Sequence, residues 1–401
     1  FPHSLGLLYS TFTAFLGFKV NEDEYKLMGL AAYGKPNLVH KVYKVIKVHK
    51  DGSFKLDLSY FGFRESFSMF NKNFEKLFGK ARKPEEKITQ RHKDLAASIQ
   101  TVTEEIYFKM LNYLYSITKT ENLCLSGGVA LNALANGKIY EKTPFKKIYI
   151  FGAAGDSGAA VGASLFVYHD VIPSGARNLA TEGSANIRHK IKNLYFGSQY
   201  SNNQIEQTLK RYNLKYKKFI KEEELINKTA ELLSQGKIIG WFQGHCEYGP
   251  RALGNRSILC KPNPRSMKTK MNIIKLREQF RPFAGSILED KVQDYFDVPE
   301  KNLWSPFMTF CFRVKKNIKN DLAAIIHADG TCRIQTVNKV NGRYYLLIKK
   351  FYELTGIPCI LNTSFNLKGE PIVESPEQAI EDFLKTKMDY LVIGGFVVFG
   401  Q

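Results

Sequence analysis

Cysteine is scarce in this sequence, and its spacing excludes several classes of protein. Six cysteines are spread over 401 residues, and no two of them form a C-x-x-C pair. Disulfide scaffolds and zinc sites usually need closely spaced cysteines. The pattern therefore favours a reduced, cytoplasmic protein. The six positions are Cys124, Cys246, Cys260, Cys311, Cys332 and Cys359.

Long apolar runs are also missing. No apolar stretch approaches the roughly 18 residues that a membrane-spanning helix needs, and no signal-peptide pattern opens the sequence. The hydrophobic fraction of 44% is ordinary for a globular protein, and the length suffices for two domains with their own cores. We therefore expect no association with a membrane.

Acidic residues are outnumbered. The chain has 58 Lys and Arg against 38 Asp and Glu, which gives a formal net charge of +20. Such a field attracts polyanions or phosphorylated substrates, and composition alone does not distinguish between them.

The imbalance is sharpest between Tyr248 and Arg277, where no Asp or Glu occurs. Cations so close along a chain repel each other, so an anion from elsewhere is expected among them. For the lysines after Arg265, the alternative is a solvated basic face. Arg251 and Arg256 are instead embedded among Ala, Leu, Gly and Ser, and arginine offers a planar fork to phosphate or carboxylate.

The centre of this basic segment is interrupted by Gly249, Pro250 and Gly254. These residues exclude one smooth helix, because glycine and proline end regular structure. They predict a backbone that bends closely around a ligand.

In the first part of the chain, two predicted strands each end in glycines. The strand at residues 122–125 leads to Gly127, Gly128 and a helix bearing Asn132, and the strand at residues 147–151 leads into the loop 152–158. Two such loops in one α/β unit are expected to converge on one ligand. Predicted helices span residues 5–18 and 93–116, and another begins at residues 21–24.

The second part predicts further helices and strands after a linker at residues 173–176. A turn at residues 327–331 leads into a strand with Arg333 and Gln335 on one face. A short apolar strand at residues 359–361 ends in Asn362 and its polar neighbours, which suits oriented donors or a simple hydrogen-bonded turn. Predicted helices span residues 201–211 and 222–234, and predicted strands span residues 237–242 and 307–314.

Seven segments occur in an order that resembles the O-carbamoyltransferase family of nodulation-factor and antibiotic carbamoylation. The most distinctive is EYGPRALGNRS at residues 247–257. The others are KLMGLAAYG (26–34), LSGGVALN (125–132), AAGDSG (153–158), FRPFA (280–284), HADGTCRIQTV (327–337) and NTSFN (362–366).

The resemblance implies an α/β fold in two domains. Residues 1–185 would be the C-terminal part of a ribonuclease-H-like lobe of the sugar kinase and actin-type ATPase kind. Residues 186–401 would be a YrdC-like twisted α/β domain. The N-terminal lobe of the family, with two histidines one helical turn apart and a phosphate hairpin, has no match among these residues, so the chain is expected to hold half an acyl-transfer site.

The resemblance also implies site residues in the first domain. Gly127, Gly128 and Asn132 would hold adenosine, and Lys26 would lie near phosphate, unless it is a surface lysine. Asp156 would bind a divalent metal, Mg²⁺ or Fe²⁺; the alternative for Asp156 is a helix N-cap.

In the second domain, the resemblance implies formation of carbamoyl-adenylate from carbamoyl phosphate and ATP. Fixed cations would neutralise two anionic reactants. His327 would be the better acid-base candidate, ahead of His245. Arg333 would bind the carbamoyl group or its phosphate. Phosphate ligands would be Arg251, Arg256 and Arg281, and orienting groups would be Asn362, Ser364 and Asn366.

Three functions follow from these observations. The first is an ATP-dependent O-carbamoyltransferase that acts on a hydroxyl of a small-molecule acceptor, a sugar or secondary metabolite. The second uses tRNA as the acceptor, which +20 would suit, although no aromatic and basic RNA-binding module is visible and a nucleic-acid partner is not expected. The third is a nucleotide-binding subunit without turnover. If the chain forms an oligomer, we expect a homodimer.

Overall fold

The computed structural model describes residues 1–168, 191–299 and 303–400 as an α/β protein. The predicted linker at residues 173–176 and the predicted domain boundary at residue 185 lie outside the described residues. Among the described residues, no helix is both long and apolar enough to cross a membrane.

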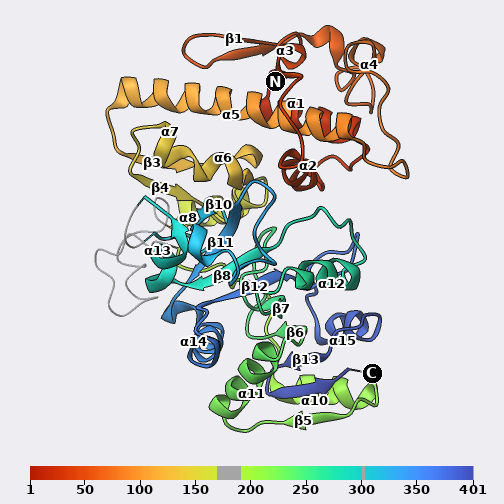
Figure 1. Ribbon diagram of the computed structural model, residues 1–401, viewed down its shortest axis with the longest axis vertical. Coiled ribbons are helices and arrows are strands. Elements are labelled where there is room, and N and C mark those ends of the chain that lie inside the picture. The colour runs from red at the N-terminus through yellow and green to blue at the C-terminus, as the bar shows by residue number, and fades with distance from the viewer. Residues whose placement is uncertain (169–190, 300–302, 401) are drawn as a thin grey trace.

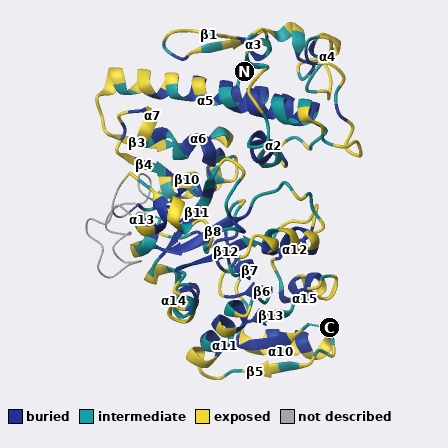
Figure 2. Ribbon diagram, in the orientation of Figure 1, coloured by how far each residue is buried: buried dark blue, intermediate teal, exposed yellow. Residues whose placement is uncertain are grey.

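The first half is built around one long helix, α5 (Gln90–Thr118), which lies across the upper part of the molecule in Figure 1. Its residues Leu95, Ile99, Val102 and Ile106 are fully buried, as their helical spacing predicts. Met110, four residues after Ile106, continues this spacing but is 43% exposed, because the second half of α5 extends beyond the helices that cover the first half (Figure 2).

Short elements surround α5. The helices are α1 (Leu5–Phe15), α2 (Glu24–Ala31), α3 (Val39–Val42), α4 (Lys72–Phe78), α6 (Ala133–Gly137), α7 (Ile139–Lys142) and α8 (Gly158–Phe166). The strands are the antiparallel pair β1 (Ile46–Val48) and β2 (Phe54–Leu56), and the parallel pair β3 (Asn122–Leu125) and β4 (Lys147–Ile150).

The second half is a mixed sheet of ten strands in the order β5-β14-β13-β6-β7-β12-β8-β11-β10-β9. Only β6 with β13 and β8 with β11 pair in parallel. The strands are β5 (Tyr216–Lys218), β6 (Ile239–Phe242), β7 (Arg256–Cys260), β8 (Ala284–Leu288), β9 (Phe296–Asp297), β10 (Phe310–Val314), β11 (Thr331–Val337), β12 (Cys359–Ser364), β13 (Tyr390–Ile393) and β14 (Phe396–Phe399).

Helices cover both faces of this sheet. Apolar side chains of α11 and α14 pack on one face, and those of α10, α12, α13 and α15 pack on the other. Their bounds are α10 (Asn202–Arg211), α11 (Glu222–Ser234), α12 (Ser266–Ile274), α13 (Val292–Tyr295), α14 (Arg343–Thr355) and α15 (Pro376–Leu384). Alternation within a strand decides which core each residue joins: Leu259 joins the α11 and α14 core, whereas Ile258 and Cys260 join the other.

Two predicted boundaries differ from the structure. The strand after Pro358 does not stop at Leu361 but continues to Ser364, because β7 pairs with it over its whole second half. Arg256 and Ser257 are not part of the bent loop, since they begin β7. The α/β prediction itself is confirmed.

The two halves share contacts. Cys311 of β10 lies in the core of the first half, and the Asn136 side chain of α6 donates to the Thr309 carbonyl at 2.8 Å. The Tyr33 hydroxyl, just after α2, donates to the Phe280 carbonyl at 3.2 Å. These contacts place α2 against the segment that leads into β8.

Candidate active site

A buried carboxylate shapes the loop between β6 and β7. Oε1 of Glu247 accepts hydrogen bonds from the backbone N–H groups of Leu253 and Asn255 at 2.7 Å and of Arg256 at 3.1 Å. Gly249 and Gly254 have φ of 111° and 107°, which L side chains rarely adopt. The predicted bend is therefore present, and Arg251 lies within it.

The loop lies on the face of the sheet that carries Arg333. The Ala252 carbonyl accepts from the Asn362 amide at 3.3 Å, and the Leu253 carbonyl accepts from the Gln335 amide at 2.8 Å. Arg333 and Gln335 share this face, as their spacing predicts, because Arg333 and Asn362 both pair with Ala284 of β8.

Four guanidinium groups gather here: Arg251, Arg277, Arg281 and Arg333, named below the arginine cluster. Burial lowers the pKa of Arg251 to about 9, and the charge of Arg333 lowers it further in the same direction. Burial and then Arg281 lower the pKa of Arg277, and burial lowers that of Arg333. Arg251, Arg277 and Arg333 therefore lie in a partly buried, positive environment that an anion would stabilise.

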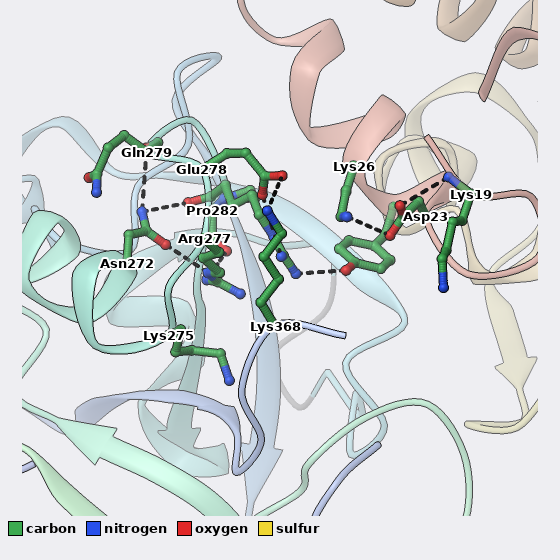
Figure 3. Close-up of polar contacts among 12 residues, drawn as sticks. Lys19, Asp23, Lys26, Asn272, Lys275, Arg277, Glu278, Gln279, Pro282 and Lys368 are labelled. Carbon is green, nitrogen blue, oxygen red and sulfur yellow. Dashed lines mark hydrogen bonds and ion pairs between the residues drawn. The ribbon is translucent and has the colours of Figure 1, made fainter. Parts of the chain in front are cut away.

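Very little negative charge offsets the arginine cluster. Among the described residues, Glu278 alone forms an ion pair with it, 3.7 Å from Arg281. Burial alone would raise the pKa of Glu278, but its own backbone N–H, then Lys26, Arg281 and Lys368, lower it. Lys26 is itself paired with Asp23 at 2.7 Å. Figure 3 shows Lys26 and Asp23 on the side of α2, and Arg277 and Glu278 on the segment after α12.

Three buried polar atoms on the same face of the sheet have no hydrogen-bond partner among the described residues: Nε of Arg333, Oδ1 of Asn362 and Oγ of Ser257. Register places them together, since Ser257 pairs with Ser364, two residues from Asn362 on β12. Buried polar atoms are nearly always satisfied in folded proteins, by protein, water or ligand. These three indicate a polar ligand or ordered water beside the arginine cluster.

A buried lysine fixes the end of β12. Nζ of Lys275 donates to the Ser364 carbonyl at 2.5 Å and to the carbonyl and side-chain oxygens of Asn366 at 2.8 and 2.9 Å. Burial, followed by Arg277 and Arg281, lowers its pKa well below the usual value. Ser364 Oγ donates to Asn366 Oδ1 at 2.7 Å. The predicted orienting residues Ser364 and Asn366 are thus held to the segment that carries Arg277.

Arg256 is not brought into the arginine cluster. Its side chain lies on the opposite face of β7 from Ser257, where its guanidinium stacks 3.6 Å from the centre of the Phe242 ring. Four main-chain carbonyls accept from it, those of Ser198, Gln243, Gly244 and Asn255, at 2.6–3.2 Å. The two terminal nitrogens of Arg256 are occupied in holding the backbone, and its Nε has no hydrogen-bond partner among the described residues. The structure thus places Arg256 apart from the arginine cluster.

Both ring nitrogens of His327 are also occupied. Nε2 lies 3.1 Å from the Phe283 carbonyl and Nδ1 lies 3.3 Å from the Thr331 hydroxyl. Since a carbonyl only accepts, the proton is assigned to Nε2. Burial lowers the pKa of His327 to about 4, so the ring is neutral near pH 7. His245 is exposed and contacts the Gly197 carbonyl at 2.8 Å.

The two glycine loops of the first half lie together, as predicted. β3 and β4 are parallel neighbours, and the Gly127 N–H donates to the Ala154 carbonyl at 2.7 Å. A Cβ added at Gly127 or Gly128 would meet nothing within 4 Å, so both backbones border open space. Asn132 is turned away: its amide pairs reciprocally with Gln100 at 3.0 and 3.1 Å and caps α6.

The loop 152–158 also meets the basic loop of the second half. The Tyr248 hydroxyl donates to the Ser157 carbonyl at 2.6 Å, and an added Cβ on Gly249 would lie 3.1 Å from the Ala153 side chain. Asp156 in this loop is exposed. Within the described ranges, no three or more His, Cys, Asp or Glu gather as a metal would require. One exposed carboxylate does not fit a Mg²⁺ or Fe²⁺ site.

Two cavities lie elsewhere on the molecule. One of about 500 Å³ lies where β6 and β13 end and is bordered by His245 and Arg343, and one of about 640 Å³ lies beside α13 and β9. No residue of the arginine cluster lines either of them. In the first of these cavities, the charge of Arg343 is neutralised by the carboxylate of Glu222, which lies 2.6 Å away.

Sequence reasoning missed four residues of the site. Lys275 and Arg277 stood in the acid-free segment without a role, and Glu247 stood at the edge of its motif. Tyr25 had no signal at all: its hydroxyl accepts from Arg281 at 2.7 Å. A role for Glu247 could have been found, because an acid directly before a glycine-rich basic loop can accept from the N–H groups of that loop.

Comparison with known families identifies the family of this chain. The family model for the carbamoyltransferase N-terminus matches residues 1–165, and that for the carbamoyltransferase C-terminus matches residues 230–399. The chain belongs to the carbamoyltransferase family. Carbamoyltransferases are enzymes of the transferase class, and the resemblance found in the motifs is confirmed.

Two relatives match this carbamoyltransferase chain over 99% of its length. Protein sll1178 of Synechocystis sp. is 43% identical, and 67% of that protein is covered. The nodulation protein NolNO of Sinorhizobium fredii is 37% identical, and 56% of it is covered. The chain thus spans between about half and two thirds of the length of these relatives. Among solved structures, full-length HypF in its phosphate- and nucleotide-bound form matches 45% of this chain and 22% of its own, with 19% identity and a TM-score of 0.31.

Proposed function

We propose that this carbamoyltransferase forms carbamoyl-adenylate from carbamoyl phosphate and ATP at the arginine cluster. The observation that carries the proposal is charge: four partly buried guanidinium groups act on one another, with Glu278 as their only ion-paired acid among the described residues. Two phosphorylated reactants repel each other strongly unless fixed cations lie between them. Cations already in place need no reorganisation when the reaction occurs, which is the largest lever for such transfers.

The reaction balances with one water. Water cleaves the phosphate from carbamoyl phosphate and leaves carbamate and inorganic phosphate. A carbamate oxygen then attacks the α-phosphorus of ATP, the bond from that phosphorus to the β-phosphate oxygen breaks, and pyrophosphate leaves with the electron pair. Arg251, Arg281 and Arg333 would hold the phosphate and carbamoyl oxygens. The free Oδ1 of Asn362 can accept from the carbamoyl amide, while Lys275 fixes Ser364 and Asn366 beside it.

His327 has a different place in this proposal from the one expected. Its ring is neutral and bonded at both nitrogens, so it holds the turn before Arg333 rather than moving a proton. Catalysis would rest on positioning and charge.

For the whole protein, we propose transfer of the carbamoyl group to a hydroxyl of a small-molecule acceptor, a sugar or secondary metabolite. The hydroxyl oxygen would attack the carbamoyl carbon, AMP would leave, and the hydroxyl proton would pass to solvent. The support is family membership and the likeness to a nodulation protein. The open space at Gly127 and Gly128, joined to the basic loop through Tyr248, is where the first half would receive the adenylate.

Pyrophosphate exchange tests adenylate formation in this chain. Labelled pyrophosphate should enter ATP when carbamoyl phosphate is present and not when it is omitted. Arg251→Ala should lower the exchange rate at least a hundredfold, because a buried cation beside the leaving group is lost. Arg265→Ala, an exposed arginine of the same basic segment, is the matched control and should leave the rate within twofold. Exchange that is absent in the parent chain, or unchanged in Arg251→Ala, would remove the mechanism.

A further inference from the structure

Tyr25 is a polar group of the first half that lies inside the arginine cluster of the second. It is on the first turn of α2, and its hydroxyl oxygen accepts from Nη2 of Arg281 at 2.7 Å. The guanidinium of Arg281 also lies 4.9 Å from the centre of the Tyr25 ring. Stacking and hydrogen bonding together fix the direction of the phenol.

The phenol of Tyr25 contacts Arg281 directly and acts electrostatically on the other three arginines. Tyr25 is among the groups whose charge acts on Arg251, Arg277 and Arg333, besides its direct contact with Arg281. Tyr25 therefore lies within electrostatic range of the whole arginine cluster.

The hydroxyl proton of Tyr25 has no acceptor among the described residues, because the oxygen is used only as an acceptor from Arg281. Guanidinium groups cannot accept hydrogen bonds. The carboxylates of Asp23 and Glu278 also act on the phenol, but among the described residues no hydrogen bond joins either of them to it. A phosphate or carbamate oxygen held by the same arginines would be an acceptor for the hydroxyl proton.

We propose that Tyr25 is a ligand-binding residue of the site, whose hydroxyl donates a hydrogen bond to an oxygen of the phosphorylated reactant bound in the arginine cluster. The inference rests on the proposed function. Both halves of the chain would then contribute to the site, because α2 supplies a hydrogen-bond donor that the ten-stranded sheet does not contain.

Tyr25→Phe is the test, because phenylalanine keeps the ring against Arg281 and removes only the hydroxyl. Binding of ATP and of carbamoyl phosphate, each alone, is measured by isothermal titration calorimetry. We expect the dissociation constant of at least one of them to rise about tenfold or more, as for one hydrogen bond to a charged group. The reactant that is affected identifies the oxygen that Tyr25 contacts.

Tyr33→Phe is the matched control. Tyr33 also ties the α2 region to the second half, through the Phe280 carbonyl and Lys268, but it is not among the neighbours of the arginine cluster. Its binding constants should stay within twofold of the parent. Melting temperatures without ligand should agree with the parent within about 3 °C for both variants, so that a binding defect in Tyr25→Phe is not one of folding.

A double-mutant cycle separates direct contact from positioning of Arg281. If Tyr25 contacts the ligand, Tyr25→Phe still weakens binding in an Arg281→Ala background. An effect that vanishes in that background overturns the proposal, as does unchanged binding of both reactants by Tyr25→Phe. Arg333→Met shows which idea has failed: if it loses binding while Tyr25→Phe does not, only the role of Tyr25 is wrong, and if neither loses binding, the proposed function is wrong as well.

Discussion

Arg251 and Arg256 stand five residues apart in one motif and meet opposite surroundings. Arg251 has no hydrogen-bond or ion-pair partner among the described residues, and Arg333 adds like charge to its burial. Arg256 gives its guanidinium protons to four carbonyls and stacks on Phe242. Arg251 is thus an unpaired charge, whereas Arg256 stabilises the backbone through its hydrogen bonds.

This difference predicts opposite effects of removing the two charges. Arg251→Met should raise the free energy of unfolding of the ligand-free chain by about 1–3 kcal/mol, because an unpaired buried charge is replaced by an apolar side chain. Arg256→Met should lower it by about 3 kcal/mol or more, since several buried carbonyls lose their donor. Chemical denaturation checks both, and a loss of stability in Arg251→Met would contradict the account of the arginine cluster.

His327 predicts a pH effect on stability. Its pKa is lowered to about 4 in the fold from an ordinary 6.5, so between these values the unfolded chain binds a proton that the folded chain does not. Stability therefore falls as pH drops from about 6.5 towards 4, by about 3 kcal/mol for this group. His327→Gln should flatten that part of the curve. A curve of unchanged slope would show that His327 does not carry the effect.

At the scale of elements, the strands and helices near the site follow from local pattern. The helix at Glu222–Ser234, the strand at Asn122–Leu125 and the faces of β11 were all predictable from periodicity and glycine placement. The placement of Arg256 was not, because its face depends on the point at which β7 begins and pairs with β6, where Arg256 lies opposite Phe242. The motif does not reveal that β7 begins at Arg256. The side chains of Arg256 and Ser257 were therefore not predicted to lie on opposite faces of the sheet.

Gly254 is the tightest point between the basic loop and the helix layer. It has φ of 107°, and an added Cβ would lie 2.1 Å from the ring of Tyr344 on α14. Gly254→Ala should lower the free energy of unfolding by about 3 kcal/mol through backbone strain and displacement of Tyr344. Gly128→Ala, where an added Cβ meets nothing within 4 Å, should leave it within about 0.5 kcal/mol. Equal stability of the two variants, measured by denaturant titration, would contradict this view of the loop.

For the whole molecule, the sequence predicted an α/β chain and its family, because seven motifs occur in the order typical of that family. It did not predict how the halves join. The segments around Tyr25, Gly127, Gly249 and Arg281 are far apart in sequence, and tertiary contacts bring them together in two places: Tyr25 meets Arg281, and the glycine loop 152–158 meets Tyr248 and Gly249. Tyr25 could not have been found, because its partner lies 256 residues away.

The net charge of +20 has a consequence at this scale as well. A small phosphorylated ligand bound by a few buried arginines should lose affinity only modestly with salt, because buried charges are weakly screened. RNA bound across the basic surface should lose it steeply. The salt dependence of binding therefore separates a small-molecule site from a nucleic-acid one.

The most direct measurement is calorimetric titration of ATP into the parent chain and into Arg333→Met and Arg265→Ala. The account predicts that the parent and Arg265→Ala bind ATP with the same affinity and that Arg333→Met binds at least tenfold more weakly, since it removes a cation from the centre of the arginine cluster. Equal affinity in all three proteins would contradict the claim that these arginines hold a phosphorylated ligand.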